Sequence, residues 1–417
     1  MKARENALQI LIKSEKNESY ANLELKKKIK VTDPRERALV TELVYGSLRY
    51  RLRLDYIIRK FSKVPFRKIN ENIKNVLRLS IYQIIFLDKI PDSAACNEGT
   101  NLALKYGGKG ASSFVNGVLR NVSREKNNIQ YPNSEVENLM YYYSFPESIV
   151  KIMLRDYSYS GAKKILNALN MSKGICIRPN LLKTTAEDFE KLIEKYEYEK
   201  GEECYYMKGF SVTDNDLYDR GIYTVQDRAS MMCAELLAPE KGEKVLDLCA
   251  APGGKSCYMA QLMENKGEII SCDIHEHRCE LIEKNALRLG VDIIKAKVND
   301  ASTENEEFKN AFDKVLVDVP CSGIGVIAKK PDIKWSEKDF DSLTSLQYNI
   351  LEKSSSYVKK GGKLVYSTCT INKDENEHIV EKFLENNKGF VKVSEYIQLM
   401  PGFKTDGFFM CRLERIY

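Results

Sequence analysis

The sequence predicts an α/β protein with three parts: an all-helical front, a small α+β region and a doubly wound parallel sheet. Apolar residues recur at helical spacing up to about Val122, and short mixed elements begin near Ile175. From Gly242 onward strands and helices alternate, which is typical of βαβ units that build a parallel sheet. A chain of 417 residues has room for these parts as separate domains. We place the three domains at residues 1–126, 135–230 and 231–417.

The helical front carries start and stop signals as well as periodicity. Leu39, Leu43 and Val44 repeat at the spacing of one helix face. The segment Asp33-Pro34-Arg35-Glu36 offers an N-cap, a proline at the first helical position and a glutamate at the third. The pair Gly107-Gly108 would stop a later helix. We therefore expect a compact helical bundle in this part.

The two later parts are predicted from shorter patterns. In the middle part we expect a helix over 185–198 and strands over 176–179, 204–212 and 222–225. In the last part we expect strands over 244–249, 268–273, 293–298, 314–318 and 363–367. Helices are expected after Gly254, over 276–289 and from Asn372.

Composition and charge narrow the class of protein. With 43% hydrophobic and 30% charged residues, the chain resembles a folded globular protein and not a disordered one. Residues 1–126 hold 26 Lys and Arg against 13 Asp and Glu, although the whole chain carries only +6. This asymmetry predicts a polyanionic partner for the front part.

Three further patterns predict absences. The longest apolar run, Leu79–Leu87, is too short to cross a bilayer, and the N-terminus lacks the apolar segment of a signal peptide. We therefore predict a cytoplasmic protein with no membrane contact. The eleven cysteines include no C-x-x-C pair, and the three histidines stand at no zinc-site spacing, so we expect neither disulfides nor a metal.

A glycine-rich turn between a strand and a helix predicts a ligand site. The segment V-L-D-L-C-A-A-P-G-G-K-S contains Gly253 and Gly254, which would let a ligand approach the backbone. Asp273 ends the next strand and could accept hydrogen bonds from both ribose hydroxyls, while Asp300 would lie beside adenine. Neither G-x-G-x-x-G nor a P-loop is present, so phosphates are disfavoured. S-adenosylmethionine fits this pattern better than a dinucleotide or ATP.

Two cysteines are predicted to share one rim of that site, because each follows a strand of the parallel sheet. Cys321 lies in D-V-P-C-S-G-I-G and Cys369 in Y-S-T-C-T. Methyl transfer to C5 of cytosine needs thiolate attack at C6, so one cysteine would attack and the other would assist release. Asp318 would contact either the flipped base or the cofactor. The spacing alone does not decide which cysteine attacks. Packing roles are expected for Cys249, Cys257, Cys272 and Cys279.

Four segments together carry a family resemblance: D-L-C-A-A-P-G-G-K-S, D-V-P-C-S-G, K-K-P-D-I-K-W and S-T-C-T-I-N-K-D-E-N-E. They closely resemble the RNA cytosine-C5 methyltransferases. The basic front, with F-V-N-G-V-L-R-N at Phe114–Asn121, looks like a NusB-like RNA-binding domain, which points to the bacterial Sun/RsmB type. The resemblance implies a Rossmann-like class I methyltransferase domain that modifies a cytosine of small-subunit (16S) ribosomal RNA, of the cytosine 967 class. We also expect a monomer.

The resemblance also implies roles for individual residues. Cys369 would be the nucleophile and Cys321 would act in product release. Lys329, Lys330 and Lys334 are expected to meet RNA phosphates, and Trp335 to lie in the core or to stack on a base. The segment Val298-Asn299-Asp300 departs from the pattern of many relatives, which carry a glycine beside the acid, although the aspartate itself is retained. The contacts to S-adenosylmethionine would come from Cys249, Ala250, Ala251, Pro252, Gly253, Gly254, Lys255, Asp273, Arg278, Asp300 and Asp318.

Three other functions remain open from the sequence. An amino-group methyltransferase would commonly show a [DNS]-P-P-[FYW] motif where this chain has Asp318-Val319-Pro320-Cys321. A non-catalytic NusB-like RNA-binding factor would explain the helical front but not the ligand site. A transfer RNA enzyme of the same superfamily is disfavoured only by the NusB-like front.

Overall fold

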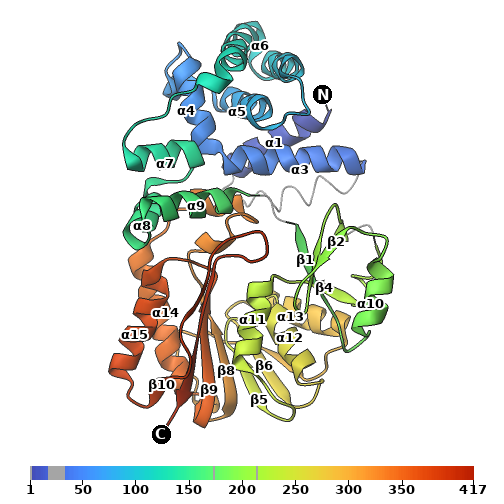
Figure 1. Cartoon of the computed structure of the whole chain (residues 1–417), viewed down its shortest axis with the longest axis vertical. Helices are drawn as coiled ribbons and strands as arrows, with labels where there is room; N and C mark the ends of the chain where they lie inside the picture. The colour runs from blue at the N-terminus through green and yellow to red at the C-terminus, as the bar shows by residue number, and fades with distance from the viewer. Residues whose placement is uncertain (1, 17–32, 172–173, 213–214) are drawn as a thin grey trace. The chain divides into compact units, whose positions relative to one another are not determined.

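The computed structural model describes residues 2–16, 33–171, 174–212 and 215–417 (Figure 1). The chain forms two compact units. A helical unit holds residues 1–170 together with 330–336, and a mixed α/β unit holds 171–329 together with 337–417. The division into three domains stays a prediction, since compactness groups residues 135–170 with the helices before them.

Two helix boundaries in the helical unit lie where the cap and stop signals predicted them. Asp33 is the N-cap of α3, and its carboxylate accepts a hydrogen bond of 2.7 Å from the main-chain N–H of Arg35. Within α6 the backbone leaves the helical region at Gly108, where φ is +77°, so the glycine pair breaks this helix as expected. The helices of the unit are α1 Lys2–Lys16, α3 Pro34–Arg49, α4 Arg51–Phe61, α5 Glu71–Phe86, α6 Asp92–Glu125, α7 Glu135–Tyr143, α8 Glu147–Asp156 and α9 Tyr159–Asn170.

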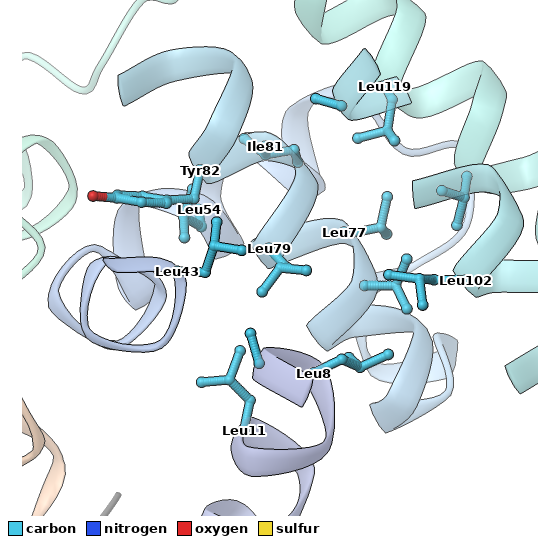
Figure 2. Packing of buried hydrophobic residues seen from close by; sticks show 14 of the residues in the cluster. Leu8, Leu11, Leu43, Leu54, Leu77, Leu79, Ile81, Tyr82, Leu102 and Leu119 are labelled. Atoms are coloured by element: carbon cyan, nitrogen blue, oxygen red, sulfur yellow. The ribbon is translucent and has the colours of Figure 1, made fainter. Parts of the chain in front are cut away.

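The core of this unit is built around α5, which is buried along most of its length. Leu77 and Leu79 of α5 lie in the middle of the apolar cluster (Figure 2). Leu8 of α1, Leu43 of α3 and Leu102 of α6 surround them and are at most 1% exposed. Burial of these side chains from separate helices stabilises the bundle that the periodicity predicted.

The α/β unit contains a small antiparallel sheet in the order β2-β3-β1-β4. The helix expected over 185–198 is shorter: it ends at Ile193, and the last expected residue, Tyr198, begins β2 and pairs with Met207 of β3. These elements are β1 Ile175–Pro179, α10 Ala186–Ile193, β2 Tyr198–Lys200, β3 Tyr205–Met207 and β4 Tyr223–Val225, and α11 Arg228–Leu237 follows them.

The larger sheet has the order β10-β12-β9-β8-β5-β6-β7, with β11 paired to β12. The five strands from β9 to β7 are parallel, as predicted, so their carboxyl ends meet at one edge. The antiparallel strands β10 to β12 were not anticipated. The strands are β5 Lys244–Asp247, β6 Glu268–Asp273, β7 Ile294–Val298, β8 Phe312–Asp318, β9 Val358–Thr368, β10 Phe390–Lys392, β11 Ile397–Leu399 and β12 Phe408–Arg415.

Helices cover this sheet, and one of them differs from the prediction. The helices α12 Gly254–Leu262 and α13 Glu276–Leu289 lie where they were expected. The helix predicted from Asn372 is replaced by a 3₁₀ helix over Lys373–Glu375, and α15 begins only at Glu377. The interruption occurs at Asn376, whose φ of −112° and ψ of −102° are not helical.

Across the described ranges, no helix combines the length and apolar character that a bilayer span requires. The same residues contain no group of three or more His, Cys, Asp or Glu side chains arranged to hold a metal ion.

Candidate active site

The turn between β5 and α12 uses its two glycines in different ways. Gly253 has φ of +91°, and a Cβ there would lie 3.2 Å from the Cα of Ile282 in α13. Glycine is therefore required at this position by the backbone conformation and by packing on α13. At Gly254 the nearest atom to an added Cβ would be 3.9 Å away, so this position has open space. A ligand can reach the backbone at Gly254, whereas the sequence predicted that role for both glycines.

Asp247, at the end of β5, is a buried carboxylate with one unused oxygen. The hydroxyl of Ser256 donates a 2.7 Å hydrogen bond to Oδ2. Oδ1 has no hydrogen-bond partner within the part of the chain that is described. Burial raises the pKa of Asp247 to about 6. An acceptor with an unpaired, buried oxygen therefore stands at the end of the strand that leads into the glycine turn.

Asp273 ends β6 and is linked to the turn after β5. The main-chain N–H of His275 donates to its Oδ1 at 3.2 Å, and Arg278 forms an ion pair with Oδ2 at 3.1 Å. The Arg278 guanidinium also donates to the carbonyl oxygen of Ala251 at 3.3 Å. Arg278 therefore connects Asp273, the carboxylate predicted to bind the ribose hydroxyls, with the glycine-containing turn.

Asp300 follows β7, the neighbour of β6 in the sheet. Its Oδ1 accepts hydrogen bonds from the main-chain N–H of Ser302 at 2.9 Å and from the Ser302 hydroxyl at 2.6 Å. The main-chain N–H of Asn299 donates to the carbonyl of Asp273 at 3.0 Å. The structure thus places Asp273 and Asp300, the two carboxylates predicted to contact the ligand, at the ends of adjacent strands. Both hydrogen-bond donors to Asp300 come from its own turn.

Asp318 ends β8 and is held by two partners. Lys255 donates to its Oδ2 at 2.6 Å, and the hydroxyl of Ser367 on β9 donates to its Oδ1 at 2.9 Å. Burial alone would lower the pKa of Lys255, but the Asp318 carboxylate outweighs burial and raises it. The pair places a fixed negative charge and its cation between the glycine turn and the cysteine loops.

The charges at this sheet edge fit S-adenosylmethionine. Carboxylates at the ends of neighbouring strands suit ribose hydroxyls, which donate hydrogen bonds, and a sulfonium and an ammonium, which are cations. A phosphate would be repelled by the same carboxylates. Oδ1 of Asp247 lacks a donor, and the backbone at Gly254 is open, so the edge has both an acceptor and space for such a ligand.

The two rim cysteines lie together. The Sγ atoms of Cys321 and Cys369 are 3.1 Å apart, because β8 and β9 are adjacent parallel strands in which Asp318 pairs with Ser367. The hydrogen bond with Cys369, together with burial, raises the pKa of the Cys321 thiol well above its ordinary value. The structure therefore places the two sulfur atoms side by side, as the positions of both cysteines after adjacent strands predicted.

The cysteines expected to serve in packing differ from this pair in their surroundings. Three of them are buried and Cys249 is half-buried. Burial raises the pKa of all four thiols, which keeps them protonated. This set consists of Cys249, Cys257, Cys272 and Cys279.

Glu375 joins the loops that carry the two cysteines, and sequence reasoning missed it. Its fully buried carboxylate accepts a 2.8 Å hydrogen bond from the main-chain N–H of Ser322. Gln347 of α14 (Phe340–Ser355) donates to it at 3.0 Å, and the Asn372 side chain at 3.1 Å. The hydroxyls of Ser322 and Thr370 are 2.9 Å apart above it. The available signal was an acid six residues after Cys369 in a segment already singled out.

Gly325 fixes the Cys321 loop to the rest of the sheet. Its main-chain N–H donates to the carbonyl of Cys369 at 3.0 Å. A Cβ at Gly325 would lie 1.9 Å from the carbonyl oxygen of Gly407, just before β12. No side chain fits there, so glycine is needed for the close approach of the two backbones.

The lysines predicted to meet RNA phosphates are mostly engaged elsewhere. Lys329 forms ion pairs with Asp227 and with Asp406, the latter at 2.7 Å. Lys330 is exposed. The prediction for Lys329 is therefore corrected, because two carboxylates already neutralise its charge.

Lys334 is also not a phosphate contact, since it is only 2% exposed within the helical unit. Its ammonium donates to the carbonyls of Arg49 at 2.8 Å and Ser144 at 3.1 Å, and to Oδ1 of Asn170 at 2.6 Å. Trp335, the next residue, is half-buried and donates from Nε1 to a main-chain carbonyl of α3 at 2.8 Å. In the K-K-P-D-I-K-W segment, Lys334 and Trp335 thus hold the segment to the helices of this unit.

Comparisons with known proteins match both parts of the chain. Residues 234–414 match the family described as 16S rRNA methyltransferase RsmB/F, and residues 1–124 match the NusB family. The "Probable ribosomal RNA small subunit methyltransferase B" of Bacillus subtilis (strain 168) is 39% identical, over 99% of this chain and 98% of its own. A protein of the same name from Synechocystis is 31% identical, over 93% and 90%. A crystal structure of a methyltransferase homologue from Pyrococcus horikoshii, 27% identical, covers 68% of this chain and 99% of its own, with a TM-score of 0.60.

Proposed function

Because the chain belongs to the ribosomal RNA small subunit methyltransferase B family, we propose that it methylates C5 of a cytosine in 16S ribosomal RNA through a covalent cysteine adduct. The family confirms the resemblance to Sun/RsmB-type enzymes and the NusB and Rossmann-like methyltransferase folds. S-adenosylmethionine is the methyl donor. The single observation that supports C5 chemistry is the 3.1 Å separation between Sγ of Cys321 and Sγ of Cys369.

The reaction needs one sulfur that attacks and one group that handles protons. In the proposed sequence, the Cys369 thiolate bonds to C6 of cytosine, and the electron pair displaced onto C5 takes the methyl group. The methyl donor leaves as S-adenosylhomocysteine. Water or another base at the site then takes the C5 proton, and the C5–C6 double bond re-forms as the C6–S bond breaks, which returns the thiolate. Cys321, whose pKa is raised, stays a neutral thiol and can donate a hydrogen bond to the departing sulfur.

The remaining site residues are assigned by the groups that they can meet. Asp273 would hold the ribose hydroxyls, Asp300 would face adenine, and Gly254 would leave room for the methionine part. Lys255 and Ser367 hold the carboxylate of Asp318 in one position. Asp318 would therefore present a fixed negative charge between the methyl donor and the cytosine base. S-adenosylmethionine supplies an electrophilic methyl group on a sulfonium.

A transfer RNA substrate is the second candidate, and the NusB match over residues 1–124 favours ribosomal RNA over it. Within 16S ribosomal RNA, the proposed target is a cytosine of the 967 class. The cytoplasmic location and the monomeric state also stay predictions.

The test compares ribosomal RNA from a strain that lacks this gene with RNA from its parent by bisulfite sequencing. We expect one cytosine of 16S RNA to lose its protection from conversion, and to regain it when the gene is restored. Purified protein and radiolabelled S-adenosylmethionine should label the same RNA. A label on an exocyclic amino group, or on transfer RNA alone, would contradict the proposal.

A further inference from the structure

The helical unit contains a hollow of about 370 Å³ between the end of α7 and the outer face of α9. Its size is that of a pocket for a small ligand. Two aromatic rings, two cations and two small polar groups surround it, and the set includes no carboxylate. The lining residues are Tyr143, Tyr159, Ser160, Lys163, Lys164 and Asn167.

The two lysines of this hollow keep their charges available. Lys163 and Lys164 are exposed, and neither forms an ion pair with any residue that the structure describes. By contrast, Lys151 on α8 is paired with Glu147 at 2.8 Å. The ammonium of Lys163 lies 5.6 Å from the ring centroid of Tyr159, which is within range of a cation–π interaction. An anion placed here would therefore meet two cations that have no acidic partner.

The aromatic character continues beyond the hollow. Tyr143 packs edge to face on Tyr142, with ring centroids 5.0 Å apart, and Tyr142 packs on Tyr131 at 5.2 Å. Tyr142 is 41% exposed, and the guanidinium of Arg53 lies 4.6 Å from its ring centroid. A row of rings with cations on it therefore leads up to the hollow.

We propose that this hollow binds one nucleotide of single-stranded RNA, with the base against Tyr143 and Tyr159 and a phosphate against Lys163 and Lys164. Aromatic faces bind bases by stacking, which requires that the base has left a duplex stack, and lysines neutralise the phosphate. Tyr142, the exposed ring of this row, gives a neighbouring base a place to stack. The proposal rests on the proposed function in taking RNA as the ligand, but it concerns a surface other than the cysteine pair.

The test measures binding of a fluorescein-labelled single-stranded RNA of about 12 nucleotides to the full chain by fluorescence anisotropy, over a range of salt concentrations. The variant Lys163→Gln/Lys164→Gln should bind about tenfold more weakly. The slope of log K against log salt should lose about 0.7, because the two lysines hold one phosphate and each phosphate contact to a single strand contributes about 0.7. The matched control Lys151→Gln/Lys241→Gln removes the same charge from exposed lysines elsewhere and should change affinity less than about twofold.

A second pair of variants tests stacking apart from charge. Tyr159→Leu should weaken binding with no change of the salt slope, and Tyr159→Phe should bind like the wild type, while thermal unfolding checks the fold of each. An equal loss for the lysine variant and its control would overturn the proposal. So would an equal loss with duplex RNA, since a duplex offers phosphates but no free base. Methyl transfer is measured in parallel. If the wild type does not methylate RNA but still binds it more tightly than the lysine variant does, the proposed function is wrong and the proposed nucleotide site is supported.

Discussion

Cys321 and Cys369 face each other across two adjacent parallel strands, with 3.1 Å between their sulfur atoms. At that separation one sulfur can carry a proton while the other is a thiolate, and each protonation state stabilises the other through the shared hydrogen bond. The two cysteines are therefore expected to have different tasks although they share one environment. Single substitutions separate these tasks.

The first prediction concerns the division of work between the cysteines. Cys369→Ala should abolish methyl transfer, because no sulfur remains to attack C6. Cys321→Ala should allow attack but slow release, so a protein–RNA adduct should survive denaturing gel electrophoresis with radiolabelled RNA. The double variant should form no adduct. If instead Cys369→Ala accumulates the adduct, the two roles are exchanged.

The second prediction concerns Glu375. Glu375→Gln keeps the size of the side chain but replaces one acceptor oxygen by a donor, which meets the N–H of Ser322 or the amide of Asn372. An unsatisfied buried donor costs about 1–3 kcal/mol, which would displace the loops that carry the two cysteines, so the single-turnover rate of methyl transfer should fall about tenfold.

A thiol titration distinguishes positioning of the cysteines from simple structural support. Glu375 is one of the charges that raise the pKa of Cys321, so its neutralisation should lower the pH at which iodoacetamide alkylates that thiol. The control Glu381→Gln changes an exposed acid of α15 and should alter neither value. A slower reaction with an unchanged alkylation profile would limit Glu375 to structural support.

The third prediction is a pH dependence at Asp247. Burial raises its pKa from 3.8 to about 6 in the folded chain, so the folded state binds more protons between these values. The contribution of Asp247 to the free energy of unfolding should therefore fall as pH rises from about 4 to 6, by about 2 kcal/mol. In Asp247→Asn this fall should be absent, as urea unfolding of the ligand-free protein at pH 4.5 and 7.5 would show. Asp219→Asn, an exposed carboxylate, should behave like the wild type.

The fourth prediction concerns the buried lysine. Lys334→Met removes the donor for two main-chain carbonyls and for Asn170, which leaves buried acceptors unpaired. We expect the free energy of unfolding to drop by about 3 kcal/mol. Lys330→Met makes the same substitution at an exposed position of the same segment and should change the free energy of unfolding by less than about 0.5 kcal/mol. Equal effects would show that the buried hydrogen bonds contribute little.

The sequence predicted those features that depend on neighbours along the chain. Strand ends in a parallel sheet meet at one edge, so Asp273, Asp318 and the two cysteines could be placed together from their spacing. The role of Glu375 was missed, because the stretch around it was taken for a continuous helix in which an acid would be exposed. Strands β10 to β12 were missed because they are short or antiparallel and lack the βα alternation that revealed the others.

The burial of Lys334 shows a different limit. A lysine in a charged, polar segment is normally exposed, and its acceptors here stand 190 and 285 residues earlier in the chain, at Ser144 and Arg49. No local pattern carries that information. Hydropathy describes what a side chain prefers, whereas burial of an ammonium depends on whether acceptors from distant segments converge on it.

Residues 330–336 belong to the helical unit although the chain on either side belongs to the other one. The polypeptide therefore passes between the units at three places, near residues 170, 329 and 336, and a single cut cannot separate them. A fragment that starts at residue 171 would keep Lys334 and Trp335 but lose every acceptor that they use. Such a fragment would expose the lysine side chain and the indole in the loop that follows Cys321, so weak activity in it would report a disturbed loop as well as the loss of the NusB-like part.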